Sequence, residues 1–195
     1  RKELHMTQDE LAKKVGYASR SSINKLEKAR ILPAKKIVLM SEALSSLKKE
    51  LENRGNNINI THSAEYRIDE QFLSQLKDNL IVPMPSNYIL VENSFIQEPW
   101  NLDQLLFDLK VKGYKPILAH PERYLYYHGK RDRYKAIHNT GTKFQVNLLS
   151  VAGYYSKDEK RVALELINNG LVDFIGTDLH NHKHADAIES FINSR

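Results

Sequence analysis

The sequence predicts an α/β protein in which about five parallel strands form a partial (β/α) barrel, preceded by a small all-α helix-turn-helix segment. Two observations predict the barrel. From residue 57 onward, short apolar runs alternate with amphipathic helical stretches, and these runs end on polar or ionisable residues at regular intervals. A third observation predicts the leading segment, because the first 54 residues have helical periodicity and a strongly basic charge.

The composition excludes several classes of protein and site. With 195 residues, 41% of them hydrophobic, the chain can bury one substantial core or one medium and one small core. It has no cysteine, which excludes a disulfide scaffold, a thiolate zinc site and a cysteine nucleophile, so any metal must have nitrogen and oxygen ligands. Neither a run of ~20 apolar residues nor a signal-peptide core is found, so we expect a cytoplasmic protein without membrane insertion.

The net positive charge of the chain comes entirely from its first quarter. Residues 1–54 carry a net charge of +6, whereas residues 55–195 carry −1. A basic segment ahead of a near-neutral body indicates an anionic partner for that segment, with nucleic acid as the first candidate. The alternative is a lysine-rich helical surface that is simply solvated.

Capping signals divide the basic segment into three helices. Thr7 with a glutamate three residues later has the spacing of a capping box, which starts a helix. Gly16 suits the end of that helix, and Ser19 or Ser21 can cap the next one. Two short helices joined by a tight glycine turn form a helix-turn-helix. A third amphipathic helix is predicted over residues 35–51.

The letters MTQDELAKKVGY and SRSSINKLEKARILP resemble the Cro/C1-type (XRE-like) helix-turn-helix of phage and bacterial repressors, over residues 1–45. The resemblance implies binding to double-stranded DNA, with Gln8 against a phosphate. Ala29 stands where the family usually has glycine, and a helical module that packs without binding DNA is the alternative. The resemblance places four residues on the recognition helix, facing base edges and backbone: Arg20, Ser21, Asn24 and Lys25.

In the remaining chain the apolar runs mark the strands and the amphipathic stretches mark the helices between them. Short apolar runs separated by such helices are typical of a parallel sheet built from βα units. We expect strands at residues 58–65, 88–92, 116–120, 144–148 and 172–178. We expect helices near residues 69–79, 101–112, 130–140 and 157–169.

The apolar run of each predicted strand closes on a polar or ionisable side chain. Counting from the first of them, these residues follow one another at 27, 28, 27 and 31 positions. Because the C-terminal strand ends of a (β/α) barrel meet at one rim, we expect these side chains to lie together. Carboxylates and imidazoles suit Mn, Fe or Zn. For any one residue the alternative is a helix cap or a solvated loop position. The candidate metal ligands are Glu65, Glu92, His120, Asp178 and His180, with Asn147 a weaker candidate.

The same strand ends carry a second resemblance, over residues 46–195. The motifs AEYRID, YILVE, GYKPILAHPERYLYYH, KFQVNLLSVAGYY and VDFIGTDLHNHKH are similar to the polymerase-and-histidinol-phosphatase (PHP) metal hydrolases. Within these they resemble the bacterial tyrosine-protein phosphatases of capsular and exopolysaccharide operons. The resemblance implies a distorted (β/α) barrel with a cluster of Mn-type ions. It also implies a phosphotyrosine protein, the tyrosine-rich tail of an autokinase, as partner.

The resemblance also implies a role for each candidate residue. Glu65 matches a bridging carboxylate, and Glu92 and His120 match ligands of the same metal. Asp178 and His180 match ligands of neighbouring metals.

The HPER motif adds a cationic residue to the predicted site. Its arginine, Arg123, matches the phosphate-binding arginine of the family, and a planar guanidinium can hold two phosphate oxygens at once. The implied activity is metal-dependent hydrolysis of phosphotyrosine.

The family opens with His-x-His and Thr-Pro-His motifs, and neither occurs ahead of Glu65 in this sequence. We therefore expect partial metal binding with weak or no turnover. We also expect unpaired edges at strands 58–65 and 172–178, because five strands do not close a barrel. The helix of residues 35–53, a second copy of the chain in a homo-oligomer, or nothing would cover them.

Two other interpretations of the whole chain stay open. In one, the protein is a DNA-binding transcriptional regulator and the barrel part is an inactive remnant. In the other, the junction arose by recombination and the two parts have no joint function. We expect a first domain over residues 1–45 and a second over residues 46–195, with the seam near residues 36–46 inside a continuous helical pattern.

Overall fold

The computed structural model describes residues 34–56 and 58–194, which form two compact units that divide between His62 and Ser63. The predicted boundary between residues 45 and 46 stays a prediction. No helix in these two ranges is long and apolar enough to cross a membrane. The first two predicted helices and all five predicted DNA-contacting residues lie outside the described part: Gln8, Arg20, Ser21, Asn24 and Lys25.

The described part of the first unit is built around the helix α3 (Ala34–Asn53). This helix agrees with the predicted helix of residues 35–51 and runs without a break through the predicted seam. It ends where Gly55 takes a left-handed φ of 76° and the Asn56 amide donates to the Leu51 carbonyl oxygen at 2.9 Å.

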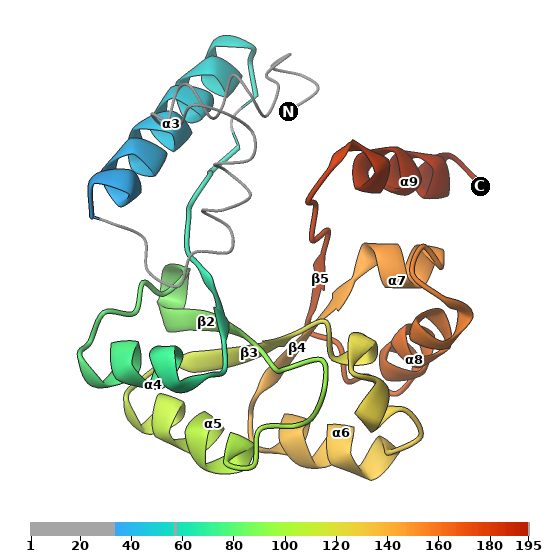
Figure 1. Cartoon of the computed structure of the whole chain (residues 1–195). Coiled ribbons are helices and arrows are strands. Elements are labelled where there is room, and N and C mark those ends of the chain that lie inside the picture. Colours follow the sequence, from blue (N-terminus) through green and yellow to red (C-terminus); the bar gives the residue numbers. More distant parts are fainter. Residues whose placement is uncertain (1–33, 57, 195) are drawn as a thin grey trace. The chain divides into compact units, whose positions relative to one another are not determined.

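The second unit is a parallel sheet of five strands whose spatial order is the order of the chain, β1-β2-β3-β4-β5 (Figure 1). Helices follow the strands, as the alternating pattern predicts, and the α/β fold with five parallel strands is confirmed. The strands are β1 (Glu65–Arg67), β2 (Tyr88–Glu92), β3 (Lys115–Ala119), β4 (Lys143–Asn147) and β5 (Phe174–Gly176). The predicted helices correspond to α4 (Glu70–Lys77), α5 (Leu102–Val111), α6 (Arg131–Asn139) and α8 (Lys157–Asn168).

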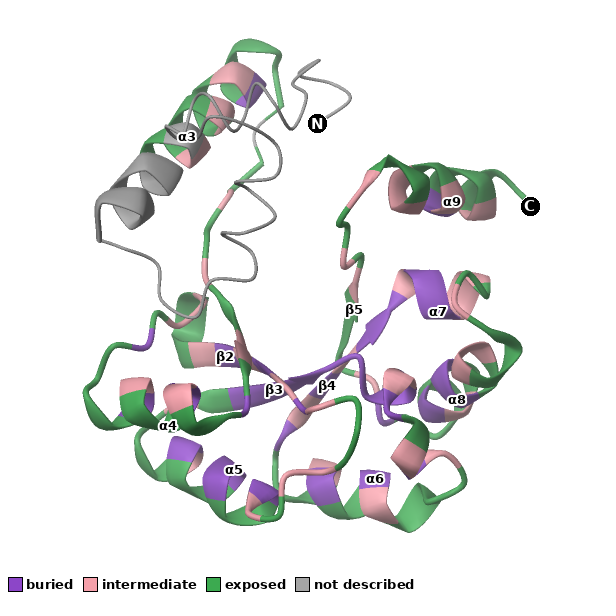
Figure 2. Ribbon diagram, viewed as in Figure 1, coloured by how far each residue is buried: buried purple, intermediate pink, exposed green. Residues whose placement is uncertain are grey.

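The core lies between these four helices and one face of the sheet, where buried residues gather (Figure 2). Alternate residues of the central strands point into it, as in a sheet covered by helices on that face. The opposite face carries the side chains from which the candidate site is built. Buried strand residues of the core are Ile89, Val91, Leu118, Phe144 and Val146, and the helices contribute Phe72, Leu106, Ile137 and Leu166 among others.

The first strand differs from its prediction. The predicted strand 58–65 starts with alternating apolar and polar side chains at residues 58–61, but β1 begins at Glu65 and ends at Arg67. Pairing decides these bounds, because Glu65 is the first residue with a register partner, Leu90 of β2. Residues 58–64 pair with no strand in the described chain, so their alternation alone forms no strand.

Two helices and three 3₁₀ turns were not predicted. The helix α7 (Leu148–Ala152) follows β4 directly, and α9 (His182–Asn193) closes the described chain. Asn181 caps α9 by accepting a hydrogen bond from the His184 amide at 3.2 Å, so His182 and His184 lie in the first turn of a helix. The 3₁₀ turns are η1 (Pro85–Asn87), η2 (Pro121–Arg123) and η3 (Leu125–Tyr127).

Candidate metal centre

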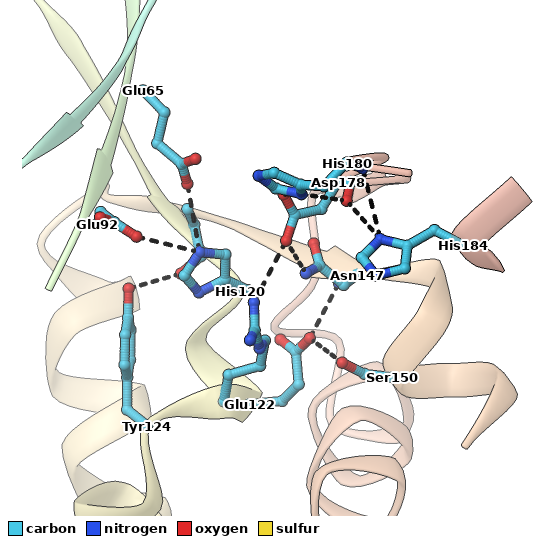
Figure 3. A network of polar contacts seen from close by, with 12 residues as sticks. Glu65, Glu92, His120, Glu122, Tyr124, Asn147, Ser150, Asp178, His180 and His184 are labelled. Atoms are coloured by element: carbon cyan, nitrogen blue, oxygen red, sulfur yellow. Dashed lines mark hydrogen bonds and ion pairs between the residues drawn. The ribbon is translucent and has the colours of Figure 1, made fainter. Parts of the chain in front are cut away.

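Glu65, Glu92 and His120 form a compact group at one end of the sheet (Figure 3). The Nε2 atom of His120 lies 3.3 Å from a carboxylate oxygen of Glu65 and 3.6 Å from one of Glu92. One ligand atom from each side chain lies within 4.8 Å of the others. The His120 side chain is 3% exposed, while the side chains of Glu65 and Glu92 are 33% and 23% exposed, so the two glutamates lie on the solvent side of the group.

Sheet register explains why three residues so distant in sequence meet. Glu65 pairs with Leu90, and side chains two residues apart on a strand share a face, so Glu65 and Glu92 lie on the same face. His120 follows β3 directly, and its amide donates to the Gln145 carbonyl oxygen of β4 at 2.7 Å. The expectation that all the ligands follow strand ends is therefore wrong for Glu65, which begins β1.

His120 is held in an unusual position. Its backbone is left-handed, with φ of 34° and ψ of 54°, and the following Pro121 starts the η2 turn. A non-glycine residue in this region is costly and is commonly found at functional sites. The imidazole stacks on the ring of Phe95, with centroids 5.5 Å apart, and packs edge-on against Tyr124.

The charge state of His120 follows from its two carboxylate neighbours. Burial alone lowers the pKa of this imidazole, but the hydrogen bonds to Glu65 and Glu92 outweigh burial and raise it to about 9. A proton on Nε2 then lies between two carboxylates. A divalent cation carries the same kind of compensating charge, and two carboxylate oxygens with one imidazole nitrogen are donors that Mn, Fe and Zn accept. The residues present therefore fit a divalent metal ion.

Arg123 and Asp178 form a second part of the site, and Figure 3 shows Asp178 beside the group of Glu65, Glu92 and His120. The Arg123 guanidinium donates to a carboxylate oxygen of Asp178 at 3.3 Å, and the Asn147 side-chain amide donates to the same oxygen at 2.9 Å. Like His120, Asp178 has a left-handed backbone, with φ of 46°. The guanidinium lies close enough to His120 to oppose protonation of its imidazole. Arg123 is therefore placed between the carboxylate–histidine group and Asp178.

His180 lies beside Asp178 but outside the group of Glu65, Glu92 and His120. Its Nδ1 atom is 3.2 Å from an Asp178 carboxylate oxygen and 2.8 Å from the Asp178 carbonyl oxygen. The imidazole of His184 also reaches this carbonyl oxygen, at 3.3 Å. The structure thus brings the five predicted metal ligands to the same end of the sheet in two clusters.

Several residues that shape the site were not predicted. Glu122, fully buried, accepts hydrogen bonds from the Asn147 amide at 3.0 Å and the Ser150 hydroxyl at 2.6 Å. The Tyr124 hydroxyl accepts from the Asn93 amide and donates to the Ala119 carbonyl oxygen, both at 2.9 Å, which joins the ends of β2 and β3. The HPER letters give the only sequence signal for these contacts, because the partners come from later elements.

Two family models match the chain, and relatives are found among curated proteins. The family model described as capsular polysaccharide synthesis, CpsB/CapC, matches residues 28–188, and a helix-turn-helix model matches residues 1–46. Tyrosine-protein phosphatase YwqE of Bacillus subtilis is 32% identical over 143 residues, which is 73% of this chain and 56% of that protein. Putative tyrosine-protein phosphatase CapC of Staphylococcus aureus is 30% identical over 139 residues, 71% of this chain and 54% of that protein.

A solved structure shows the same fold. It comes from work on YwqE of Bacillus subtilis and CpsB of Streptococcus pneumoniae, described as unique metal-dependent tyrosine phosphatases. The TM-score is 0.65 at 28% sequence identity, and the match covers 79% of this chain and 64% of the solved one. The chain spans about half the length of the curated relatives it matches.

Proposed function

The chain belongs to the CpsB/CapC family of capsular polysaccharide synthesis, and from this premise we propose that it is a metal-dependent phosphatase that acts on phosphotyrosine in proteins. The observation that carries the proposal is the group of Glu65, Glu92 and His120, whose ligand atoms lie within 4.8 Å of one another. By analogy with relatives named tyrosine-protein phosphatases, the substrate is a phosphotyrosine protein, such as the tail of an autokinase of a capsule or exopolysaccharide operon.

Each site residue receives a role in this proposal. Glu65, Glu92 and His120 hold a divalent ion, with manganese the first candidate, and Asp178 and His180 are ligands for neighbouring ions. When bound, the metal supplies a Lewis acid for the phosphoryl oxygens and lowers the pKa of water. Arg123 binds the phosphate, because a guanidinium edge can donate to two of its oxygens.

Turnover is proposed to be slower than in full-length relatives. The described residues contain a single group of three ligands within 4.8 Å, and Asp178 and His180 lie in a separate cluster. A reaction that relies on more than one ion to stabilise both the attacking and the leaving oxygen loses rate when one ion is weakly held.

Manganese titration tests the metal-binding part of the proposal. Wild type is expected to bind Mn²⁺ in calorimetry, and His120→Ala to weaken that binding by more than about tenfold, because even outer partners of metal ligands contribute 10- to 100-fold. The matched control is His182→Ala, an exposed histidine at the start of α9 outside the ligand group. Equal Mn²⁺ affinity in wild type and His120→Ala would contradict the assignment.

Hydrolysis of a phosphotyrosine peptide tests the reaction. We expect slow phosphate release that depends on Mn²⁺ and disappears in His120→Ala, while His182→Ala behaves as wild type. Rates equal to those of a full-length relative would show that the present ligands suffice. No release under saturating Mn²⁺ would refute the phosphatase proposal for this chain.

DNA binding is the second candidate function, favoured by the helix-turn-helix match over residues 1–46 and the net charge of +6 over residues 1–54. We expect duplex binding that weakens steeply with salt, since bound phosphates release counterions. Arg20→Ala or Asn24→Ala is expected to lose about 1–3 kcal/mol of affinity for a specific site. Electrophoretic mobility shifts over a salt series measure both effects. Arg30→Ala is the charge control, because it removes one positive charge at a residue not among the four assigned to the recognition helix. Salt-independent binding would exclude this function.

A further inference from the structure

Two aromatic rings from separate segments contact the guanidinium of Arg123. Its Cζ atom lies 5.0 Å from the centroid of the Phe95 ring and 4.3 Å from that of the Tyr155 ring. Phe95 belongs to the segment after β2, and Tyr155 lies between α7 and α8. A cation over an aromatic face is attracted by the ring quadrupole, so both contacts favour one position of the guanidinium.

The polar contacts of Arg123 are few by comparison. Across residues 34–56 and 58–194, its side chain donates only to Asp178, at 3.3 Å. A guanidinium has five N–H donors, so its other donors stay available for the oxygens of an anion. The two aromatic rings can thus hold the Arg123 guanidinium in place while its remaining N–H groups face an anion.

The same Phe95 ring also touches the candidate metal centre. It stacks on the His120 imidazole with an interplanar angle of 12°, and it packs against Tyr124 at 5.7 Å. Phe95 is nevertheless 44% exposed. Its position links the arginine to the group of Glu65, Glu92 and His120 (Figure 3 shows that group).

We propose that Phe95 and Tyr155 are positioning residues that fix Arg123 at the distance from the metal centre where one phosphate group meets both. The inference rests on the proposed function, because it takes Arg123 as the phosphate-binding residue. It adds that the affinity for phosphate depends on two aromatic rings that touch no phosphate themselves. Losing one ring frees the guanidinium to take other rotamers, and ordering it again on binding costs affinity.

Binding of inorganic phosphate tests this proposal without turnover. Phosphate is titrated into the full chain with Mg²⁺, a diamagnetic ion for carboxylate sites, and followed by NMR of ¹⁵N-arginine side chains. Phe95→Leu and Tyr155→Leu are expected to weaken phosphate binding by about 3- to 30-fold, the range that cation–π contacts imply, and to move the Arg123 Nε–Hε signal. Arg123→Lys assigns that signal.

Three variants serve as controls. Phe95→Tyr and Tyr155→Phe keep a ring and are expected to bind phosphate as wild type does. Trp100→Leu removes an aromatic that is 95% exposed on the same segment as Phe95, and it is expected to change nothing. The midpoint of urea denaturation is measured for each variant to check that it is folded.

Wild-type phosphate affinity in both leucine variants overturns the proposal, and so does a wild type that binds no phosphate. The proposal is also overturned if Phe95→Tyr and Tyr155→Phe lose as much phosphate affinity as the two leucine variants. Failure of the proposed function has a different signature, because phosphotyrosine peptide then stays intact in wild type with Mn²⁺ while phosphate binding still responds to the two rings.

Discussion

At the scale of single residues, the buried Glu122 connects two segments of the candidate site through hydrogen bonds. Its Oε1 atom accepts from the Asn147 amide at 3.0 Å and from the Ser150 hydroxyl at 2.6 Å, and all three residues are buried. Burial raises the pKa of this carboxyl, while the two hydrogen bonds oppose the shift. The contacts tie the turn that carries His120 and Arg123 to the end of β4.

Two substitutions of Glu122 distinguish the stabilisation that comes from its hydrogen bonds from that which comes from the volume of its side chain. Glu122→Leu leaves two buried donors without an acceptor and is expected to lower the free energy of unfolding by about 2–4 kcal/mol. Glu122→Gln keeps an oxygen at the Oε1 position, so we expect a loss of about 1 kcal/mol or less. Urea denaturation at pH 7 measures both. Equal losses in the two variants would show that the hydrogen bonds are not what matters.

The sequence pattern could predict some residues of the candidate site and not others. The positions of Glu92 and His120 at strand ends were predictable because each ends or follows an apolar run, whereas the strand bounds around Glu65 were predicted wrongly. Glu122 was not predictable, since a glutamate next to Arg123 in a short polar turn looks solvent-exposed. Its burial depends on Asn147 and Ser150, which lie 25 and 28 residues further along the chain.

At the scale of elements, Asp173 fastens the entry of β5 to its neighbours. Its carboxylate accepts from Lys143 Nζ at 2.7 Å, from the Phe144 amide at 3.0 Å, and lies 3.0 Å from His138 Nε2. Burial tends to raise the pKa of this carboxyl, but these contacts prevail and lower it below its usual 3.8. β5, a strand of three residues, thus gains a polar anchor at its start.

Asp173→Asn tests this anchor through the pH dependence of stability. Because the folded pKa lies below the unfolded value, the carboxylate stabilises the fold above about pH 4 and loses this effect as the pH falls through the folded pKa. We expect Asp173→Asn to cost about 1–2 kcal/mol at pH 7 and to flatten the decline below pH 4. Urea denaturation from pH 7 to pH 3 measures this. Asp158→Asn, 72% exposed, is the control, and an unchanged pH profile in Asp173→Asn would contradict the prediction.

The bounds of a helix or strand were predictable where the local sequence sets them, and not where pairing with another strand sets them. β2 has the predicted bounds, because an apolar run flanked by polar residues fixes both ends of a buried strand. β1 does not, since pairing with β2 begins only at Glu65. No helix was predicted at α9, although Asn181 caps one there.

At the scale of the whole molecule, the sheet of the second unit is open. Among the described residues, β1 and β5 each pair with a single strand, as the count of five strands predicts. Apolar side chains are exposed at the β5 end, including Ile175 at 53% and Leu179 at 51%. An unpaired edge with exposed apolar residues favours pairing with another chain.

We therefore expect the chain to self-associate through this edge as its concentration rises. Ile175→Lys places a charge on the edge strand and is expected to shift the sedimentation coefficient toward that of a monomer, because a desolvated lysine disfavours strand pairing. Phe107→Lys is the control, since this side chain is 58% exposed on α5, a helix that the sheet edge does not include. Sedimentation velocity over a concentration series distinguishes the outcomes. Should wild type and Ile175→Lys sediment alike at every concentration, the open edge is not what brings chains together, and the exposed residues around β5 serve no contact between copies.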